Sequence, residues 1–405
     1  MKIKLNRYSN CLDPNASYLQ DSEEFLDELN NELFDDDLQL DEDGDSPYSI
    51  IFIETGGSEQ KFIVDADKYV DPIVIISNCK NNSLPACFEI RTYLENHNHQ
   101  CILLFGSESD IANSIRQLNK YFLARNELKG SNLGVIGLPS DWLIASKVDY
   151  EEARIRFGVN LIDIRIEELK EEINKGILDD IPHEKELYEK DFSKDVIKGA
   201  LEIYSGLKRI INKYSLAGFT LRCFDLIEEY KNTACLAFSL LNEEGLIAAC
   251  EGDVPALLTM MLIKSVTRNP SFMANTSKID IRESNILFSH CTVPLNMCKK
   301  YQLMTHFESG LGIGIRGELD INKITICKIA PNLKDILCIK GEIKENLTLE
   351  NYCRTQINVN VERDALFDFL KEVFANHVLI SYGDNVDDLL TVFHFCVDGV
   401  DTKEN

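Results

Sequence analysis

Near the middle of this chain, a carboxylate lies a few residues before a predicted apolar helix. Glu251 follows an apolar run, 245–250, that is typical of a short strand, and it precedes 256–266, an apolar stretch of helical length. Asp253 occupies the position of a helix N-cap, and Pro255 suits the first helical turn. Glu251 is therefore predicted at the carboxyl end of a strand, where open α/β sheets bind their ligands. The alternative is that Glu251 is only a solvated or capping carboxylate.

The elements before Glu251 alternate between strand and helix. Apolar runs of strand type are separated by longer stretches of helical period, such as 84–96 and 110–126. The strand-type runs are 50–53, 72–76, 101–106, 133–137, 159–164 and 219–224. Alternation of this kind predicts βαβ units and parallel sheets.

The character of the chain changes after about residue 268. Short strand-type segments follow one another with turn residues between them: 312–318, 323–329, 336–343 and 355–361. An amphipathic helix is predicted over 363–376, and a last strand begins at His377. This density of short strands predicts a small barrel or sandwich.

Two or three domains are expected, because 405 residues exceed one ordinary core. We predict an N-terminal α/β domain over 1–130, a second α/β domain over 131–267 that carries Glu251, and a barrel-like domain over 268–405 that carries His290 and His377. Within the first, the acidic stretch at about 20–46 is interpreted as a solvated insertion. A metal-binding interpretation of that stretch is open, but its spacing is not that of an EF-hand loop.

The composition argues against several classes of protein and partner. The net charge of −25, with no long basic run, argues against nucleic acid and anionic membranes as partners. No apolar run reaches the roughly 18 residues of a membrane span, and the N-terminus lacks the apolar core of a signal peptide. The thirteen cysteines show no Cys-x-x-Cys pair, so we expect reduced thiols and a cytoplasmic location.

Several blocks in order resemble a known family. They are Arg222-Cys223-Phe224-Asp225, Cys250-Glu251-Gly252-Asp253-Val254-Pro255-Ala256, Pro270-Ser271-Phe272-Met273-Ala274-Asn275, Ser289-His290-Cys291-Thr292-Val293-Pro294, His306-Phe307-Glu308-Ser309-Gly310 and Asn376-His377. Together they are similar to the L-fucose isomerase and L-arabinose isomerase superfamily, and most of all to its shorter fucose isomerase-like members. The resemblance covers about 130–400 and is weak before that.

The resemblance implies an architecture and a cofactor. It implies two Rossmann-like α/β domains with parallel sheets followed by a C-terminal β-barrel domain. It also implies a divalent metal, usually Mn²⁺, and assembly into homo-trimers or hexamers. By the resemblance, the metal ligands are Glu251, Asn275, His290 and His377, the catalytic residues are Glu251 and Asn275, and the substrate-binding residues are Asp253, Arg222 and Trp142.

The function implied is a metal-dependent aldose–ketose isomerisation of an open-chain sugar. A proton moves between two carbons through a cis-enediol, which needs acid and base groups. Asn275 departs from the family, whose enzymes have a carboxylate there, and an amide cannot take up a proton. Either Glu251 acts without a second carboxylate, or Asp253 or Glu308 supplies it, or the protein is a catalytically inactive metal- and sugar-binding homologue. A lyase or epimerase with the same chemistry is a further alternative.

Overall fold

The structure is a computed structural model that describes residues 1–10 and 17–397. It divides into two compact units. Unit 1 comprises residues 1–126 and the segment from His394, and unit 2 comprises 127–393. The second sheet and the barrel both lie in unit 2, so the three predicted domain boundaries stay predictions.

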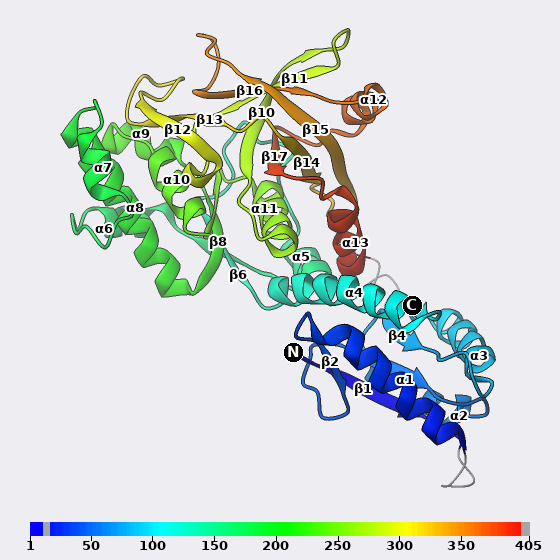
Figure 1. Ribbon diagram of the computed structural model, residues 1–405. Helices are drawn as coiled ribbons and strands as arrows, with labels where there is room; N and C mark the ends of the chain where they lie inside the picture. The colour runs from blue at the N-terminus through cyan, green and yellow to red at the C-terminus, as the bar shows by residue number, and fades with distance from the viewer. Residues whose placement is uncertain (11–16, 398–405) are drawn as a thin grey trace. The chain divides into compact units, whose positions relative to one another are not determined.

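Unit 1 is built on a parallel sheet of five strands in the order β2-β1-β3-β4-β5 (Figure 1). The strands are β1 (Lys2–Tyr8), β2 (Gln39–Asp41), β3 (Ser49–Ile53), β4 (Ile73–Ile76) and β5 (Cys101–Leu104). The helices are α1 (Ser17–Phe34), α2 (Glu59–Ile63), the 3-10 turn η1 (Ala66–Lys68), α3 (Ser83–Asn96) and α4 (Glu108–Leu128).

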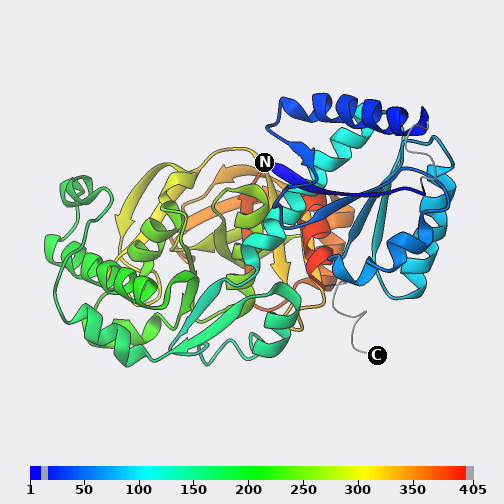
Figure 2. The same ribbon diagram turned by 90° about the horizontal axis from the view of Figure 1, so that it is seen from below.

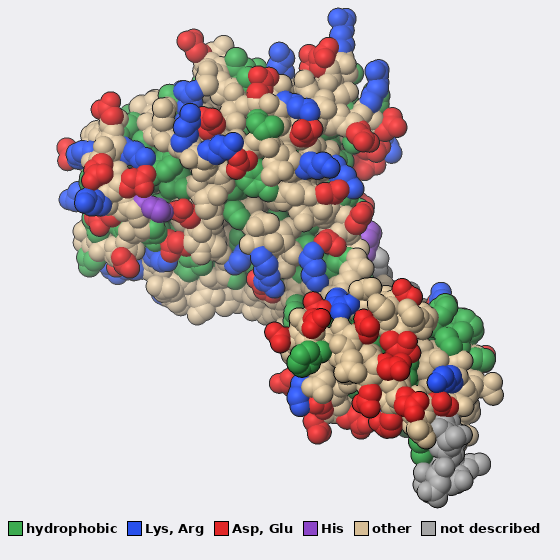
Figure 3. All heavy atoms as spheres, viewed as in Figure 1, with side chains coloured by type: hydrophobic (Ala, Val, Ile, Leu, Met, Phe, Trp, Pro, Cys, Tyr) green, Lys and Arg blue, Asp and Glu red, His purple; other side chains and the backbone are tan. Residues whose placement is uncertain are grey.

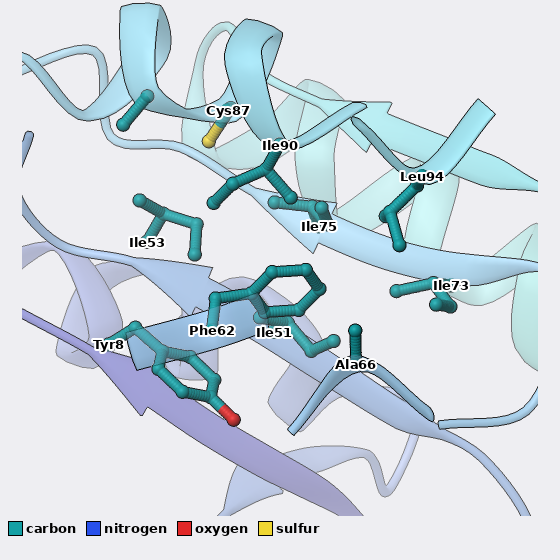
Figure 4. Packing of buried hydrophobic residues seen from close by; sticks show 11 residues of the cluster. Tyr8, Ile51, Ile53, Phe62, Ala66, Ile73, Ile75, Cys87, Ile90 and Leu94 are labelled. Atoms are coloured by element: carbon teal, nitrogen blue, oxygen red, sulfur yellow. The ribbon is translucent and has the colours of Figure 1, made fainter. Parts of the chain in front are cut away.

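Helices cover both faces of this sheet, as Figure 2 shows from below. On one face, Ile51 and Ile75 pack against Phe62 of α2 and Ile90 of α3 (Figure 4). The strands read as continuous apolar runs because a parallel sheet is buried on both sides. The alternation of strands and helices therefore predicted this sheet correctly.

The interpretation of 20–46 as a solvated insertion is wrong. Most of this stretch belongs to α1 and β2, and β2 pairs with β1 at the edge of the sheet. Helix α1 buries Leu26, Leu29 and Leu33 on its inner side, and the ring of Phe25 lies 5.2 Å from that of Phe52. Figure 3 shows Asp and Glu side chains gathered on the face of unit 1 in view. The acidic composition concealed an amphipathic helix.

Unit 2 begins with a second parallel sheet, in the order β7-β6-β8-β9. Its strands are β6 (Asn132–Ile136), β7 (Asn160–Ile164), β8 (Leu216–Leu221) and β9 (Ile247–Cys250). Its helices are α5 (Tyr150–Phe157), α6 (Ile166–Ile173), α7 (Glu184–Glu189), α8 (Lys194–Tyr214), α9 (Phe224–Tyr230), α10 (Cys235–Glu243) and α11 (Val254–Thr267).

The rest of unit 2 is a closed antiparallel barrel in the order β10-β11-β16-β15-β14-β17. Its strands are β10 (Phe272–Asp280), β11 (Asn285–His290), β14 (Lys323–Ile329), β15 (Ile336–Asn346), β16 (Thr355–Asn360) and β17 (His377–Tyr382). The described part of the chain also contains the 3-10 turn η2 (Leu295–Met297), the hairpin of β12 (Cys298–Met304) and β13 (Gly314–Leu319), and the helices α12 (Arg363–Glu372) and α13 (Val386–Val397).

Helix α11 joins the second sheet to the barrel. It follows β9 directly and lies beside β14 and β17 (Figure 1). A hydrogen bond of 3.0 Å runs from the backbone N–H of Ile329 in β14 to the hydroxyl of Thr259 in α11. The predicted fold class, parallel α/β sheets followed by a barrel, is confirmed. Among the described residues, no helix combines the length and the apolar character that crossing a membrane requires.

Candidate metal and sugar site

The predicted setting of Glu251 is confirmed. It directly follows β9, in the turn before α11. Asp253 caps α11, since its carboxylate accepts a hydrogen bond of 2.8 Å from the N–H of Ala256, and Pro255 lies in the first turn. The backbone of Glu251 has φ +63°, which places a non-glycine residue in the left-handed region. Such backbone strain recurs at functional sites, where the surrounding structure holds it in place.

The turn can form because the next residue is glycine. Gly252 has φ +75°, and a Cβ there would lie 2.5 Å from both the carbonyl oxygen of Leu138 and the Cα of Pro139. Only a residue without a side chain therefore lets the loop after β6 come this close. That loop carries Trp142, whose Nε1–H donates a 2.6 Å hydrogen bond to Oε2 of Glu251.

The barrel register brings three of the predicted residues together. Asn275 in β10 lies opposite His377, the first residue of β17. On its other side, Asn275 lies opposite Ser289 in β11, and His290 ends that strand. Because paired residues on neighbouring strands lie about 5 Å apart, the register brings together the amide from within β10 and the imidazoles from the start of β17 and the end of β11. Their spacing along the sequence conceals this proximity.

Both imidazoles approach the same carboxylate oxygen. Nε2 of His377 lies 3.5 Å, and Nε2 of His290 lies 3.8 Å, from Oε1 of Glu251. Burial opposes ionisation of Glu251, but hydrogen bonding and positive charge from the two histidines outweigh it and hold its pKa well below its usual range. Burial lowers the pKa of His290, whereas Asp253 and Glu251 overcome the effect of burial and raise the pKa of His377 to about 9.

A buried ion pair lies behind His377. Asp253 accepts a 2.9 Å hydrogen bond from Nδ1 of His377, and Nζ of Lys328 donates to both its oxygens at 3.1 and 3.0 Å. The side chains of all three residues are fully buried. Burial alone would raise the pKa of Asp253, but Lys328 and His377 lower it to about 2. The carboxylate thus fixes which imidazole nitrogen of His377 faces Glu251.

A pocket opens beside these groups. The space that a water-sized molecule could occupy is about 20 Å³, and Glu251, Asn275 and His290 are among the residues that line it. The Oδ1 atom of Asn275 is buried and has no hydrogen-bond partner in the described structure. This free acceptor is available to a cation or to a hydrogen-bond donor such as a water or a sugar hydroxyl.

Sequence reasoning missed one candidate ligand, Cys250. Among the described residues, one group of His, Cys, Asp and Glu side chains has ligand atoms all within 4.8 Å of one another, and it consists of Cys250, Glu251 and His290. His377 lies outside that group, although its Nε2 approaches the same oxygen of Glu251. The thiol directly before Glu251 was the available signal, but it was interpreted as part of an apolar strand.

The three predicted substrate-binding residues have different surroundings. Trp142 is half exposed and bonded to Glu251. Arg222 donates two hydrogen bonds to Asp141, of 3.0 and 2.8 Å, and it is not among the residues that line the pocket. Asp253 is fully buried in its ion pair. Contact of these three with a substrate stays a prediction.

Two further pocket residues come from one loop. The sequence offered Glu308 as a candidate for the second carboxylate and gave His306 no role. His306 and Glu308 both line the pocket. Burial lowers the pKa of His306 to about 4. Burial, with the charge of Glu251, raises the pKa of the Glu308 carboxyl. The motif around them was the signal, since it belongs to the blocks that carry the resemblance.

Fold and site together define a class of protein: parallel α/β sheets joined to a barrel, with a buried carboxylate–imidazole cluster that lines a pocket. No family model matches the chain. It is similar to a protein named sulfoquinovose isomerase from Alkalicoccus urumqiensis, with 21% identity over 368 residues, 84% of this chain and 82% of that one. A second protein of that name, from Clostridium sp. (strain MSTE9), is 22% identical over 204 residues, 47% of this chain and 45% of its own.

These similarities support a sugar isomerase, which is an intramolecular oxidoreductase. They do not show membership of the L-fucose isomerase and L-arabinose isomerase superfamily, so that resemblance stays a prediction. The donor set around Glu251 is a possible metal site.

Proposed function

We propose that this chain is a divalent-metal-dependent aldose–ketose isomerase that acts on an open-chain sugar. The observation that carries the proposal is the carboxylate of Glu251, which two imidazole nitrogens approach at 3.5 and 3.8 Å on the wall of a pocket. The names of the two relatives support the reaction class.

In this proposal Glu251, His290 and His377 hold the metal, and Asn275 supplies a further oxygen. The fit rests on the donor chemistry and on the unpartnered Oδ1 of Asn275. Imidazole, carboxylate and amide donors suit manganese, iron and zinc, and the family resemblance favours Mn²⁺. When bound, the ion would polarise the sugar carbonyl and lower the pKa of the neighbouring hydroxyl.

Other residues of the site position the side chains of Glu251 and His377. Trp142 holds Oε2 of Glu251, which leaves Oε1 on the side of the two histidines. Asp253 holds Nδ1 of His377 and so directs Nε2 toward Glu251. Glu251 is ionised, because the two histidines hold its pKa well below its usual range. Asn275 takes up no proton and can only orient a sugar hydroxyl or the metal.

A second candidate function is a metal- and sugar-binding homologue without turnover. The observation that favours it is the amide at Asn275, because the family's usual second carboxylate is missing there. Loss of one general acid or base typically lowers a rate by about 10²–10⁴-fold, so residual activity is compatible with either candidate.

Metal content is the first test. After dialysis against Mn²⁺, elemental analysis should find one ion per chain, and Glu251→Gln and His290→Asn should each lose most of it. His183→Asn is a matched control, because His183 is an exposed histidine in α7's first turn region and lines no part of this pocket. Unchanged metal content in the two site variants would contradict the proposed ligands.

Asn275→Asp separates the two candidate functions. The variant restores a carboxylate at nearly the same volume, and the proposal expects faster interconversion of aldose and ketose with metal binding retained. If the wild type is already fast and the variant is slower, the enzyme moves its proton without a second carboxylate at this position. If both bind metal and sugar but neither isomerises any aldose, the protein is the inactive homologue.

We also propose, from the resemblance alone, a cytoplasmic homo-trimer or hexamer. Light scattering should give at least three times the chain mass of 46.1 kDa. A stable monomer at micromolar concentration would refute the proposed assembly.

A further inference from the structure

Cysteine side chains gather around the pocket beside Glu251. Among the described residues that line it, five are cysteines: Cys223, Cys235, Cys250, Cys291 and Cys353. All five are free thiols. They come from separate segments of unit 2, so the fold brings them together and no local motif does. Thiols are oxidised in reversible steps, which makes this group a candidate for redox chemistry beside the proposed metal site.

Two of these thiols are in direct contact. Sγ of Cys223 lies 3.2 Å from Sγ of Cys250, and both side chains are buried. Cys250 ends β9 and pairs with Leu221 at the end of β8, and Cys223 follows Leu221 by two residues. Neighbouring strands lie about 4.8 Å apart, and the Cα atoms of a disulfide usually lie about 4.4–6.8 Å apart. The spacing of the two strands is therefore one that a disulfide can span.

A small movement would join the two sulfurs. The S–S bond of a disulfide is about 2.05 Å long, so the contact has to shorten by only about 1 Å. The alternative is a pair of buried thiols that only fill space, which is the ordinary role of free cysteine. Two observations favour reaction: the sulfurs already face each other, and both residues line the pocket.

The pocket has room for a small oxidant beside these sulfurs. The space that a water-sized molecule could occupy in it is about 20 Å³, which holds about one such molecule. Hydrogen peroxide is close to water in size and is therefore the oxidant that fits this space.

The reaction with peroxide needs no other reactant. One sulfur attacks a peroxide oxygen, which gives a sulfenic acid and releases one water. The other sulfur then attacks the sulfenic sulfur, and the S–S bond forms as the S–O bond breaks and a second water leaves. The two thiols thereby give up two protons and two electrons to the peroxide.

Both cysteines adjoin groups that hold Glu251 in place. Cys250 directly precedes Glu251, whose backbone is held at φ +63° by its surroundings. Cys223 directly precedes Phe224, whose ring centroid lies 4.9 Å from that of Trp142. Trp142 in turn donates a hydrogen bond to Oε2 of Glu251. Movement of the two sulfurs toward each other would therefore act on Glu251 through its own backbone and through its hydrogen-bond partner.

From this geometry we propose that hydrogen peroxide closes Cys223 and Cys250 into a reversible disulfide, and that the disulfide displaces the turn that carries Glu251. The consequence for the metal rests on the proposed function: the oxidised protein binds Mn²⁺ more weakly and turns over more slowly. The pair is then a modification site that switches the metal site off under oxidising conditions, and a thiol reductant restores it.

A peptide map of the full-length wild type tests the disulfide. The reduced protein is treated with hydrogen peroxide, its remaining thiols are blocked with N-ethylmaleimide, and it is digested with trypsin and a glutamate-specific protease. Cleavage at Glu243 separates Cys235 from Cys250. Mass spectrometry should find a linked pair of peptides that contains Cys223 and Cys250 and that dithiothreitol separates. Recovery of these two cysteines only as blocked thiols, or only in links to other cysteines, overturns the proposal.

The effect on the turn is measured at Trp142, which is the only tryptophan in the sequence. Oxidation should shift its emission maximum reversibly, whereas a loss of intensity alone would indicate quenching without movement. The affinity for Mn²⁺, measured by calorimetry, should fall at least about tenfold, as it typically does when the groups that orient metal ligands are disturbed. A disulfide that leaves the emission maximum and the affinity unchanged refutes the displacement of Glu251.

Cys223→Ser tests the pair, because it removes one thiol and leaves Cys250 in place. Each protein is compared with itself before and after peroxide, so a change in its basal properties does not enter the result. Neither the emission maximum nor the Mn²⁺ affinity of this variant should respond. Cys79→Ser is the matched control, since Cys79 is exposed, lies in unit 1 and lines no part of this pocket, and it should respond as the wild type does. An undiminished response in Cys223→Ser contradicts the proposal.

The failure of the proposed function has a different signature. If the reduced protein isomerises no aldose and binds no Mn²⁺, the proposed function is wrong, and the peptide map and the emission of Trp142 still decide the inference. If the reduced protein is active but peroxide links no Cys223 to Cys250, the proposed function stands and the inference is wrong.

Discussion

Gly252 and Glu251 form a turn that no other pair of residue types would easily replace. Two independent features require glycine at position 252: its left-handed φ and its close contact with the loop after β6. The hydrogen bond from Trp142 to Glu251 depends on that close contact. The glycine in this motif is therefore explained by the approach of a loop, and the ligand itself need not touch it.

Gly252→Ala should destabilise unit 2 severely. A Cβ at 2.5 Å from two backbone atoms must displace the loop, and φ +75° adds strain, so we expect a loss of about 3 kcal/mol or more in the free energy of unfolding. Urea denaturation followed by circular dichroism measures it.

Gly245→Ala is the matched control for this change. Gly245 has a similar φ of +81°, but a Cβ there would meet nothing within 4 Å. The free energy of unfolding of this variant should fall by only about 1 kcal/mol, which is the cost of a non-glycine residue in the left-handed conformation. Equal losses in the two variants would show that the contact with the loop does not matter.

His306 should make stability depend on pH. Its folded pKa of about 4 lies below the 6.5 of an unfolded histidine, so the unfolded chain takes up a proton first. The corresponding stabilisation is fully present above pH 6.5 and is lost as the pH falls to 4. In His306→Asn, the free energy of unfolding should therefore fall less steeply across this window than in the wild type. Parallel curves for the two proteins would contradict the prediction.

At the scale of elements, α11 and the barrel strands are held in register by a pair of buried charges. Asp253 begins α11, and Lys328 lies in β14, 75 residues further along the chain. Isolated buried charges are costly, so each of these groups depends on the other. The same carboxylate positions His377, which makes the ion pair a link between helix, barrel and site.

Lys328→Met should cost about 3–5 kcal/mol of stability, because it leaves Asp253 charged and buried without its ammonium partner. The double variant Lys328→Met with Asp253→Asn should recover part of this loss, since no uncompensated charge remains. Chemical denaturation of the single and double variants measures the coupling. The control is Lys340→Met in β15, whose pair with Asp384 is exposed, and no measurable change is expected there. Additive effects of the two substitutions would refute the coupling.

Local pattern predicted the elements well and their long-range partners poorly. The apolar run before Glu251 and the cap at Asp253 identified β9 and α11, because strand and cap signals lie within a few residues of one another. The pairing of Asp253 with Lys328 could not be predicted, since nothing in the sequence near either residue encodes it. Helix α1 was missed because its acidic side chains concealed its apolar stripe.

For the site, too, local sequence patterns were informative and long-range contacts were not. The resemblance selected Glu251, Asn275, His290 and His377, and the barrel register brings the amide and the imidazoles onto three adjacent strands. Cys250 as a candidate ligand and its contact with Cys223 became visible only with the fold. Both depend on segments that are distant in sequence, and composition and spacing carry no information about such contacts.

At the scale of the whole molecule, the two units should respond differently to metal. Every proposed ligand lies between residues 251 and 377, within unit 2. A ligand that binds only the native state raises stability in proportion to the logarithm of its concentration. Mn²⁺ should therefore raise the melting temperature of unit 2 and leave that of unit 1 unchanged.

Hydrogen exchange with mass spectrometry, with and without Mn²⁺, assigns the stabilised segments. Peptides from β9, β11 and β17 should become protected, and those from β3 and β4 should not. Glu251→Gln should abolish the difference. Equal protection of both units would contradict independent stabilisation of unit 2.

The free oxygen of Asn275 has a consequence for the history of the site. The codons for Asn and Asp differ at a single base, and both side chains present an oxygen at nearly the same point. A lineage could therefore cross between the amide and the carboxylate in one step without disturbing β10. Because the exchange keeps the volume and changes the charge beside Glu251, selection at this position would act on the electrostatics and chemistry of the pocket. Gain and loss of turnover on this scaffold would then be readily reversible events.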